Sequence, residues 1–282
     1  MGNDTVLSVA FTTPSPYASR LSNLLSQKGL NPLWIPTIST APSPQTLLSL
    51  SAALSPSSLP TLSAIVFPSR TAISAATSVL ALAPPPLLPT GPIFNLSAIG
   101  RDAELLAPNF ISSLCSNSSR IQVVVPAEAT PSGVVRALGE GRGRRVLCPV
   151  PRVVDLKEPP VVGDMMKELR LAGWIAVKVE AYETKWMGEQ CLGSLEMVEK
   201  VDGLVFSSIA EVEGFLKGLK GIGWDWDILR ARWPDMVVAA HGPVTAKGAE
   251  KLGVAVDVVG TQYESFQGVV DAVALKLSTL LN

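Results

Sequence analysis

The feature that most constrains the fold is an internal repeat. Three landmarks recur at similar spacing: a glycine that ends a helical segment, a phenylalanine that ends an apolar run, and a glycine in a later turn. The pairs are Gly29 and Gly173 (144 residues apart), Phe67 and Phe206 (139), and Gly100 and Gly242 (142). Offsets this close are hard to obtain by chance, so the chain is predicted to consist of two related halves.

Each half alternates short apolar runs, rich in Val and Ile, with segments whose apolar residues follow the helical period. One kind of segment reads strand, turn, helix, glycine, strand, and extends from VLSVAF to PLWIP and again from RVLCPV to IAVKVEAY. The other kind is SAIVFPSRTAISAA with SAIGRDAELLA, and later DGLVFSSIAEVEGFL with VVAAHGPVTAKGAEKLG. Continuous apolar strands between helices predict parallel sheets covered by helices on both faces. The expected helices span residues 17–28, 163–172, 211–219, 244–252 and 265–281.

Stretches rich in Ser, Pro and Ala interrupt this pattern. Thr37 to Pro60, and a proline cluster at 83–92, are predicted to be surface loops or short helices that end at prolines. The segment GEGRGRR at 139–145 follows a helical segment, whereas the glycines of a dinucleotide-binding motif follow a strand. These glycines therefore indicate a turn rather than a nucleotide site.

Composition narrows the possible functions. Apolar residues make up 47% of the chain and the formal net charge is −1, so buried cores are expected, with no global attraction to nucleic acid or to an anionic membrane. An anionic ligand must then be met by local groups. A single histidine cannot build a histidine-rich metal site, and the P-loop and GxSxG motifs are absent. Cys115, Cys148 and Cys191 are far apart in sequence and are expected to be buried thiols.

The ends of the chain favour a soluble intracellular protein, or a mature form from which a targeting segment has been removed. The N-terminus enters a strand-like run almost at once, without the apolar core of a signal peptide or the Arg/Ser-rich lead of a transit peptide. No apolar segment reaches membrane-spanning length without Pro or charge. The expected location is the cytoplasm, or the plastid stroma if a transit peptide has been removed.

Five turns are the candidate binding elements. Each lies where a predicted strand ends and a predicted helix begins, and the free N–H groups and dipole of a helix N-terminus favour a carboxylate or phosphate. Each hydroxyl could equally be a plain helix cap. The candidate residues are Thr12 and Thr13; Ser69 and Arg70; Gly100 and Arg101; Ser207 and Ser208; and Gly242, Val244 and Thr245.

His241, the only histidine, precedes the last of these turns. An imidazole can serve as a general base, but neither a nucleophile nor an orienting carboxylate is identifiable near it in sequence. The equivalent turn in the first half has Ile99 before its glycine, so the backbone feature recurs and the histidine does not. The Gly-Pro-Val-Thr turn is therefore the stronger candidate.

The order of these segments resembles the uroporphyrinogen-III synthase family across nearly the whole chain. The matching pieces are IVFPSRTAISAA, SAIGRDAELL, GWIAVKVEAYETKW, DGLVFSS, AAHGPVTAKGAEKLGV and SFQGVVDAVALKL. The strongest are the Tyr182-Glu183-Thr184 segment and the turn from Gly242 to Thr245. Departures from the family pattern leave open whether the chain is a synthase or a divergent paralogue. They are Thr12-Thr13-Pro14 in place of Thr-Arg-Pro, and Pro68-Ser69-Arg70 and Ser207-Ser208-Ile209 in place of Thr-Ser-Pro.

The resemblance implies two flavodoxin-like α/β/α domains with parallel sheets, swapped connectivity and a cleft between them. Residues 1–37 and 184–282 would form one discontinuous domain and residues 41–180 the other, with crossing segments at 38–40 and 181–183. The implied enzyme is a lyase of tetrapyrrole (haem and chlorophyll) biosynthesis. It cyclises the linear tetrapyrrole hydroxymethylbilane and inverts the last pyrrole ring through a spiro intermediate. It would need no cofactor and no metal, would bind neither nucleic acid nor membrane, and is expected to be a monomer.

The same resemblance suggests roles for individual residues. Tyr182 would donate a proton or hydrogen bond to the departing hydroxyl, or would be a buried tyrosine at the domain crossing. Ser69, Ser207, Ser208, Gly242 and Thr245 would bind substrate carboxylates, and Arg70, Arg101 and Lys247 would be ion partners or exposed helix charges. The alternative functions are a catalytically inactive tetrapyrrole- or anion-binding paralogue on the same scaffold, and a nucleotide- or sugar-binding α/β protein. The absence of a phosphate fingerprint opposes the last of these.

Overall fold

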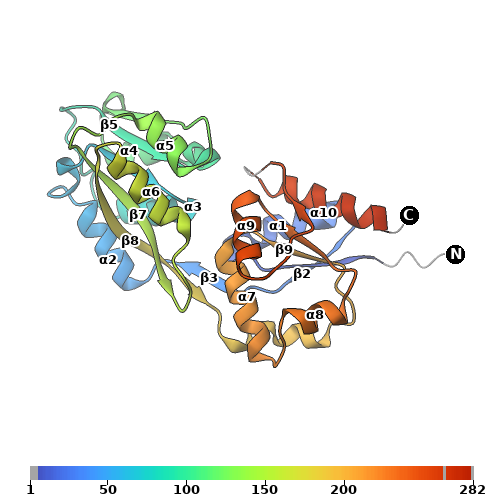
Figure 1. Cartoon of the computed structure of the whole chain (residues 1–282). Helices are drawn as coiled ribbons and strands as arrows, with labels where there is room; N and C mark the ends of the chain where they lie inside the picture. The colour runs from blue at the N-terminus through green and yellow to red at the C-terminus, as the bar shows by residue number, and fades with distance from the viewer. Residues whose placement is uncertain (1–5, 263–264, 281–282) are drawn as a thin grey trace. The chain divides into compact units, whose positions relative to one another are not determined.

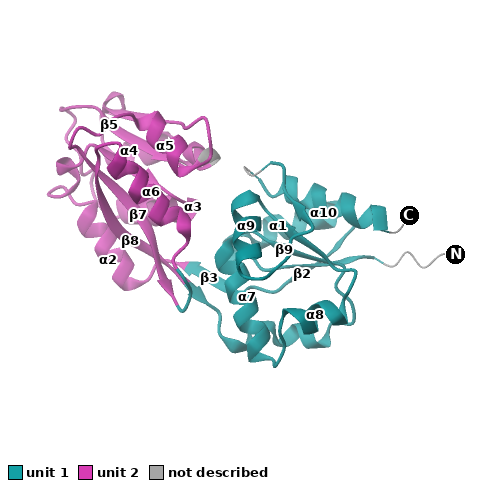
Figure 2. Ribbon diagram, in the orientation of Figure 1, with its two compact units in different colours: residues 1–40, 155–157, 185–282 teal, residues 41–154, 158–184 magenta. Residues whose placement is uncertain are grey.

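The computed structural model describes residues 6–262 and 265–280 of the chain. The chain divides into two compact units (Figure 2). Unit 1 contains residues 1–40, 155–157 and 185–282, and unit 2 contains residues 41–154 and 158–184. The chain leaves unit 1 within strand β3 (Ile38–Ala41) and returns to it within strand β8 (Ile175–Trp186).

Unit 1 is built on a five-stranded sheet in the order β11-β10-β9-β1-β2, of which β2 and β9 are labelled in Figure 1. Each neighbouring pair in this sheet is parallel. The strands are β1 (Ser8–Phe11), β2 (Asn31–Trp34), β9 (Gly203–Phe206), β10 (Val237–Ala240) and β11 (Val258–Val259). The helices are α1 (Ser15–Gln27), the 3-10 helix η4 (Glu189–Met197), α7 (Ile209–Gly221), α8 (Trp226–Arg232), α9 (Pro243–Lys251) and α10 (Gln267–Leu280).

Alternation along the strands of unit 1 fills a core on each face of the sheet. Val9 and Phe11 pack with Leu21 of α1 and Val273 of α10, whereas Ala10 between them packs on the opposite side with residues of η4, α7, α8 and α9. Successive side chains of a strand point to opposite faces, so an all-apolar strand must be covered twice. This explains why β1, β9 and β10 read as continuous apolar runs.

Unit 2 contains a six-stranded sheet in the order β3-β8-β7-β4-β5-β6. Parallel pairing joins β7 to β4, β4 to β5 and β5 to β6. Its other strands are β4 (Ala64–Phe67), β5 (Phe94–Ala98), β6 (Ile121–Val124) and β7 (Arg145–Val154). The α-helices are α2 (Pro44–Ala53), α3 (Arg70–Leu80), α4 (Pro108–Leu114), α5 (Pro131–Leu138) and α6 (Pro160–Leu171). The 3-10 helices are η1 (Leu59–Thr61), η2 (Gly100–Leu105) and η3 (Ser118–Arg120).

The two sheets share one strand order with different chain connectivity. In unit 1, the strands taken in chain order have the flavodoxin arrangement 2-1-3-4-5. In unit 2, β7 and β8 occupy the places of β1 and β2, but they follow β4, β5 and β6 in the chain. The α/β class with mostly parallel sheets, and the swapped connectivity that the family resemblance implied, are therefore confirmed.

One local prediction was wrong. The Ser/Pro-rich stretch from Thr37 to Pro60 was expected to form only loops or short helices, but Ile38–Ala41 forms strand β3 before helix α2. Ile38 and Thr40 are β-branched, and Ile38 is buried, so pairing beside β8 outweighs the loop-like composition. The turn expected at 139–145 is present between α5 and β7.

The structure also bears on the expected burial of the cysteines and on whether a helix could cross a membrane. Cys115 and Cys148 are buried and Cys191 is half-buried, and all three are free thiols. Burial raises the pKa of the Cys148 thiol to about 12, so this group does not ionise near neutral pH. Among the helices that the structure describes, none has both the length and the apolar character needed to cross a membrane.

Candidate active site

The three candidate turns of unit 1 follow neighbouring strands. Thr12 and Thr13 follow β1, Ser207 and Ser208 follow β9, and the Gly242–Thr245 turn follows β10. Because parallel strands end at one edge of a sheet, this order brings the turns together at that edge. A direct contact joins two of them, since the Thr245 hydroxyl donates to the Ser207 carbonyl at 3.2 Å.

A residue that sequence reasoning missed lies at the centre of two of these turns. Glu211, in the first turn of α7, is only 1% exposed. Its Oε2 accepts from the Thr12 hydroxyl and from the Ser207 N–H, each at 2.9 Å. Its Oε1 accepts from the Ser208 hydroxyl at 3.1 Å and from the Ser207 hydroxyl. Three hydroxyls and one amide therefore converge on a single buried carboxyl group.

These contacts oppose the effect of burial on Glu211. Burial raises the pKa of the Glu211 carboxyl, while the hydrogen bonds from Ser207, Thr12 and Ser208 work in the opposite direction. An ionised carboxylate offers about four lone-pair positions, and here four donors meet it. The sequence signal was the capping-box spacing Ser-x-x-Glu, because Ser208 caps α7 by accepting from the Glu211 N–H at 3.3 Å.

Thr13 differs from its neighbour Thr12. Its hydroxyl is buried and has no hydrogen-bond partner among the residues that the structure describes. Its carbonyl accepts from the indole N–H of Trp34 on β2 at 2.8 Å. The structure therefore assigns Thr13 a backbone contact within the sheet and no side-chain hydrogen bond in the described part of the chain.

The turn after β10 presents its backbone. Gly242 is the N-cap of α9 and provides no side-chain cap, and Pro243 occupies the first helical position. The first N–H groups of a helix lack intrahelical acceptors, so this N-terminus retains donors and a positive dipole end for an anion. Val244 is 65% exposed on this turn.

His241 immediately before this turn makes structural contacts within unit 1. Its N–H donates to the Phe206 carbonyl at 2.9 Å. Its imidazole packs edge-on against Phe266, with ring centroids 5.2 Å apart. These contacts favour a packing role for the histidine.

In unit 2, the structure brings together two of the residues predicted from the sequence. Ser69 caps α3 by accepting from the Ala72 N–H at 3.2 Å, and its hydroxyl lies 2.8 Å from the Tyr182 hydroxyl. Tyr182 belongs to β8, is 5% exposed and packs in the core cluster that includes Phe67. A residue of the turn after β4 therefore contacts a tyrosine 113 positions further along the chain.

Arg70, next to Ser69, forms an ion pair. Its Nε lies 3.3 Å from Oδ1 of Asp102 in η2, and the two side chains are 38% and 26% exposed. Burial raises the pKa of Asp102, and the charge and hydrogen bond of Arg70 lower it. Asp102 was not among the residues predicted from the sequence. Gly100 and Arg101 begin η2, and their side chains lie outside what the structure describes.

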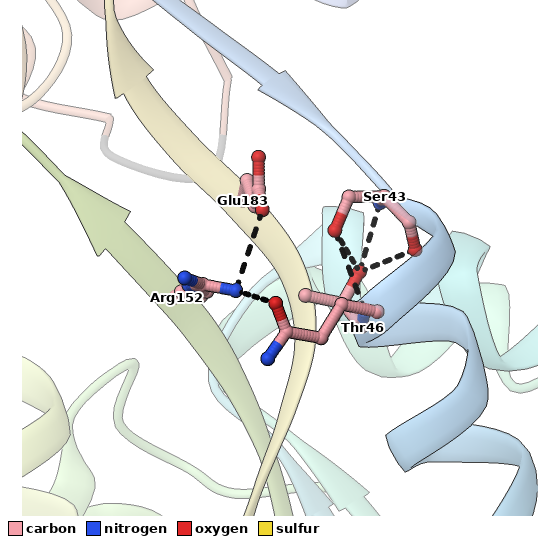
Figure 3. A network of polar contacts seen from close by, with 5 residues as sticks. Ser43, Thr46, Arg152 and Glu183 are labelled. Atoms are coloured by element: carbon pink, nitrogen blue, oxygen red, sulfur yellow. Dashed lines mark hydrogen bonds and ion pairs between the residues drawn. The ribbon is translucent and has the colours of Figure 1, made fainter.

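A polar network holds the strand that carries Tyr182 (Figure 3). Arg152 on β7 lies 3.9 Å from the Glu183 carboxylate on β8 and donates to the side chain of Gln45 on α2. The same helix begins with a capping box, in which Ser43 and Thr46 exchange hydrogen bonds. Because Glu183 is the residue after Tyr182 on β8, this network lies next to the part of the strand that carries Tyr182.

The fold and the candidate site together define this chain as a protein of two related α/β units. Two α/β units of one strand order carry strand-to-helix turns whose donors are neutral hydroxyls and backbone amides, with a tyrosine–serine pair in unit 2. The family model for uroporphyrinogen-III synthase HemD matches residues 19–269, and the chain belongs to this family of tetrapyrrole biosynthesis.

Solved structures share the fold at low sequence identity. A mutant uroporphyrinogen III synthase from the extremely thermophilic bacterium Thermus thermophilus is 17% identical, with a TM-score of 0.55 and 98% of both chains covered. Uroporphyrinogen-III synthetase from Helicobacter pylori is 16% identical, with a TM-score of 0.53 and coverage of 98% of this chain and all of that chain. Comparison with curated protein sequences found no match.

Proposed function

We propose that this chain is a uroporphyrinogen-III synthase that closes hydroxymethylbilane with inversion of the last pyrrole ring through a spiro intermediate, without a cofactor. Family membership supports the reaction class. The observation that carries the proposal for this chain is the 2.8 Å contact between the Tyr182 and Ser69 hydroxyls. Proton donation to a leaving group requires an oriented hydroxyl, and the contact with Ser69 orients the hydroxyl of Tyr182.

The hydroxyl pair can be arranged for donation. The Ser69 oxygen already accepts from the Ala72 N–H, and its own proton can be donated to the Tyr182 oxygen. In this arrangement the Tyr182 hydroxyl is the group that donates a proton to the departing hydroxyl of the substrate. As the C–O bond of the hydroxymethyl group breaks, the electron pair leaves with the oxygen, the Tyr182 proton completes a water molecule, and an electrophilic methylene carbon remains on the pyrrole. Orientation of the resulting electrophile toward the substituted pyrrole carbon is the remaining task, and positioning effects can supply it.

Carboxylate binding is proposed for the turns that retain outward donors. The first of these is the N-terminus of α9, through the backbone N–H groups of Gly242, Val244 and Thr245, and the second is the turn at Ser69 and Arg70, where the Arg70 guanidinium is the donor. Arg70 would exchange or share its Asp102 partner when it binds a substrate carboxylate. The other predicted binding residues, namely Thr12, Thr13, Gly100, Arg101, Ser207 and Ser208, stay predictions, as do the domain boundaries and the monomeric state.

A second candidate function is a tetrapyrrole- or anion-binding paralogue without ring-closing activity. The occupied donors around Glu211 favour it, because they withdraw two turns of unit 1, after β1 and after β9, from an incoming carboxylate. The altered tripeptides at Thr12-Thr13-Pro14 and Ser207-Ser208-Ile209 favour it as well.

One assay separates the two candidates. The protein is incubated with hydroxymethylbilane generated enzymatically in the same vessel, and the products are oxidised and resolved into type I and type III isomers. Type III product in excess of the protein concentration supports the synthase. Type I product alone, with tetrapyrrole binding seen by fluorescence quenching, supports the paralogue and overturns the proposed function.

A further inference from the structure

The Glu211 carboxyl group occupies donors that the sequence had suggested for substrate. The hydroxyls of Thr12, Ser207 and Ser208 and the N–H of Ser207 all converge on it. Each hydroxyl has one proton to donate. A hydroxyl that donates to Glu211 therefore has no proton left for an incoming carboxylate.

The same carboxyl group is shielded from solvent and has no cationic partner among the residues that the structure describes. Glu211 is 1% exposed, and no ion pair found in the described ranges 6–262 and 265–280 includes it. Its carbonyl also accepts from the Thr37 hydroxyl at 3.0 Å, which ties the helix turn to the segment that follows β2. Neutral donors alone satisfy this carboxyl, as they would satisfy a bound carboxylate ligand.

The equivalent turn in unit 2, which follows β4, has no carboxyl group at the position that corresponds to Glu211. Ser69 caps α3 as Ser208 caps α7, and the residue three positions on is Ala72 in unit 2 and Glu211 in unit 1. The hydroxyl of Ser69 is then available to Tyr182. The carboxyl at 211 is thus a feature of one unit and not a requirement of the strand–turn–helix element.

We propose that Glu211 is a positioning residue that acts as an internal carboxylate ligand. It holds the hydroxyls of Thr12, Ser207 and Ser208 inward and withdraws the turns after β1 and β9 from substrate. In unit 1, a substrate carboxylate is then received at the N-terminus of α9, a consequence that rests on the proposed function. The role of Glu211 itself does not rest on it.

The experiment removes the internal ligand and supplies an external one. Glu211→Ala removes the atoms that acetate contains, so potassium acetate should raise the Tm of this variant in a saturable way. Potassium chloride at equal ionic strength, and the neutral isostere acetamide, should not. The wild type and Glu250→Ala, which removes an exposed carboxyl from α9, should not respond to acetate. Equal responses to acetate and acetamide, or a response shared by Glu250→Ala, would overturn the role of an anion ligand.

A second variant covers the case in which Glu211→Ala does not fold. Glu211→Gln keeps the size of the side chain but turns an NH2 group toward the donors. Its Tm at neutral pH should be lower than that of the wild type, and acetate should not change it because the space is filled. A Tm equal to that of the wild type would show that an uncharged filler suffices and would end the proposal. These readouts use no substrate, so an inactive protein can still satisfy them.

Discussion

The turn after β9 in unit 1 and the turn after β4 in unit 2 are two versions of the same strand–turn–helix element. Each begins its helix with a serine cap, at Ser208 and Ser69, and each follows a strand that ends in a buried phenylalanine. The first is closed by a carboxyl group, and the second leaves its serine to Tyr182. The difference separates a turn whose hydroxyls donate to a buried carboxyl group from a turn whose serine contacts a tyrosine, and we propose that only the second acts on substrate.

The neighbouring strand explains why only unit 1 can hold the carboxyl group. Val9 pairs with Gly203, and Val146 pairs with Ala64, so β1 and β7 are in equivalent register. Three residues further on, unit 1 has Thr12 and unit 2 has Pro149. Proline supplies neither a hydroxyl nor an N–H, and a carboxyl at position 72 would lack the donor that Thr12 gives to Glu211.

The largest expected effect comes from copying the carboxyl group into unit 2. Ala72→Glu places an ionisable group at a fully buried position without the donor equivalent to Thr12. Because a buried carboxylate without adequate partners is costly, we expect a loss of about 3 to 5 kcal/mol in the free energy of unfolding at neutral pH. Urea unfolding measures it, with Ala72→Gln as the control of matched size. A variant as stable as the wild type would break the comparison of the two turns.

The second prediction concerns the Tyr182 hydroxyl, which we propose as the proton donor in unit 2. Tyr182→Phe removes one hydroxyl, and loss of a general acid lowers turnover by about a hundredfold or more. The ring stays in the core, so the Tm should change little. Formation of type III isomer and the Tm are measured together, with Tyr17→Phe as a matched control in unit 1. Parallel losses of activity and Tm would place Tyr182 among the structural residues.

The strand–helix repeat could be predicted because its signal is local. Buried strands such as Gly203–Phe206 are continuous apolar runs, and glycines such as Gly173 with positive φ mark where helices end. The order of strands in each sheet is not encoded locally, and its expectation came from family resemblance. Strand β3 was missed because serine and proline around it dominate the composition, while its pairing with β8 is a long-range contact.

The candidate site was predictable where it follows strand ends and not where it depends on distant segments. Ser69 and Tyr182 were both named from sequence, but their contact spans 113 positions. Glu211 was missed because a glutamate in an amphipathic helix usually lies at the surface. Its burial depends on Thr12, which lies 199 positions away in sequence. That the predicted residues bind substrate stays a prediction.

A third prediction uses the pKa of Glu211 to test the difference between the turn after β9 and the turn after β4. Burial raises this pKa above its ordinary value of 4.5, so the folded state holds the proton more tightly than the unfolded state. The contribution of the carboxyl to stability is therefore fully present below pH 4.5 and declines, at a slope of about 1.4 kcal/mol per pH unit, until the pH has risen through the raised pKa. The advantage of the wild type over Glu211→Gln in urea unfolding should shrink over that range. An advantage that grows with pH would contradict the raised pKa.

The smallest expected effect belongs to His241, whose counterpart in unit 2 is Ile99. His241→Ile converts the turn after β10 into the form that the chain already uses after β5, and leaves the backbone donors of α9 in place. The edge-on contact with Phe266 is lost, and such aromatic pairs contribute about 0.5 to 1.5 kcal/mol. Turnover to the type III isomer should stay within about twofold, because the groups that we propose to bind an anion at this turn are amides rather than the imidazole. A drop of tenfold or more in His241→Ile, with an unchanged Tm, would instead assign the imidazole to the chemistry and make this turn, not Tyr182, the reactive half of the molecule.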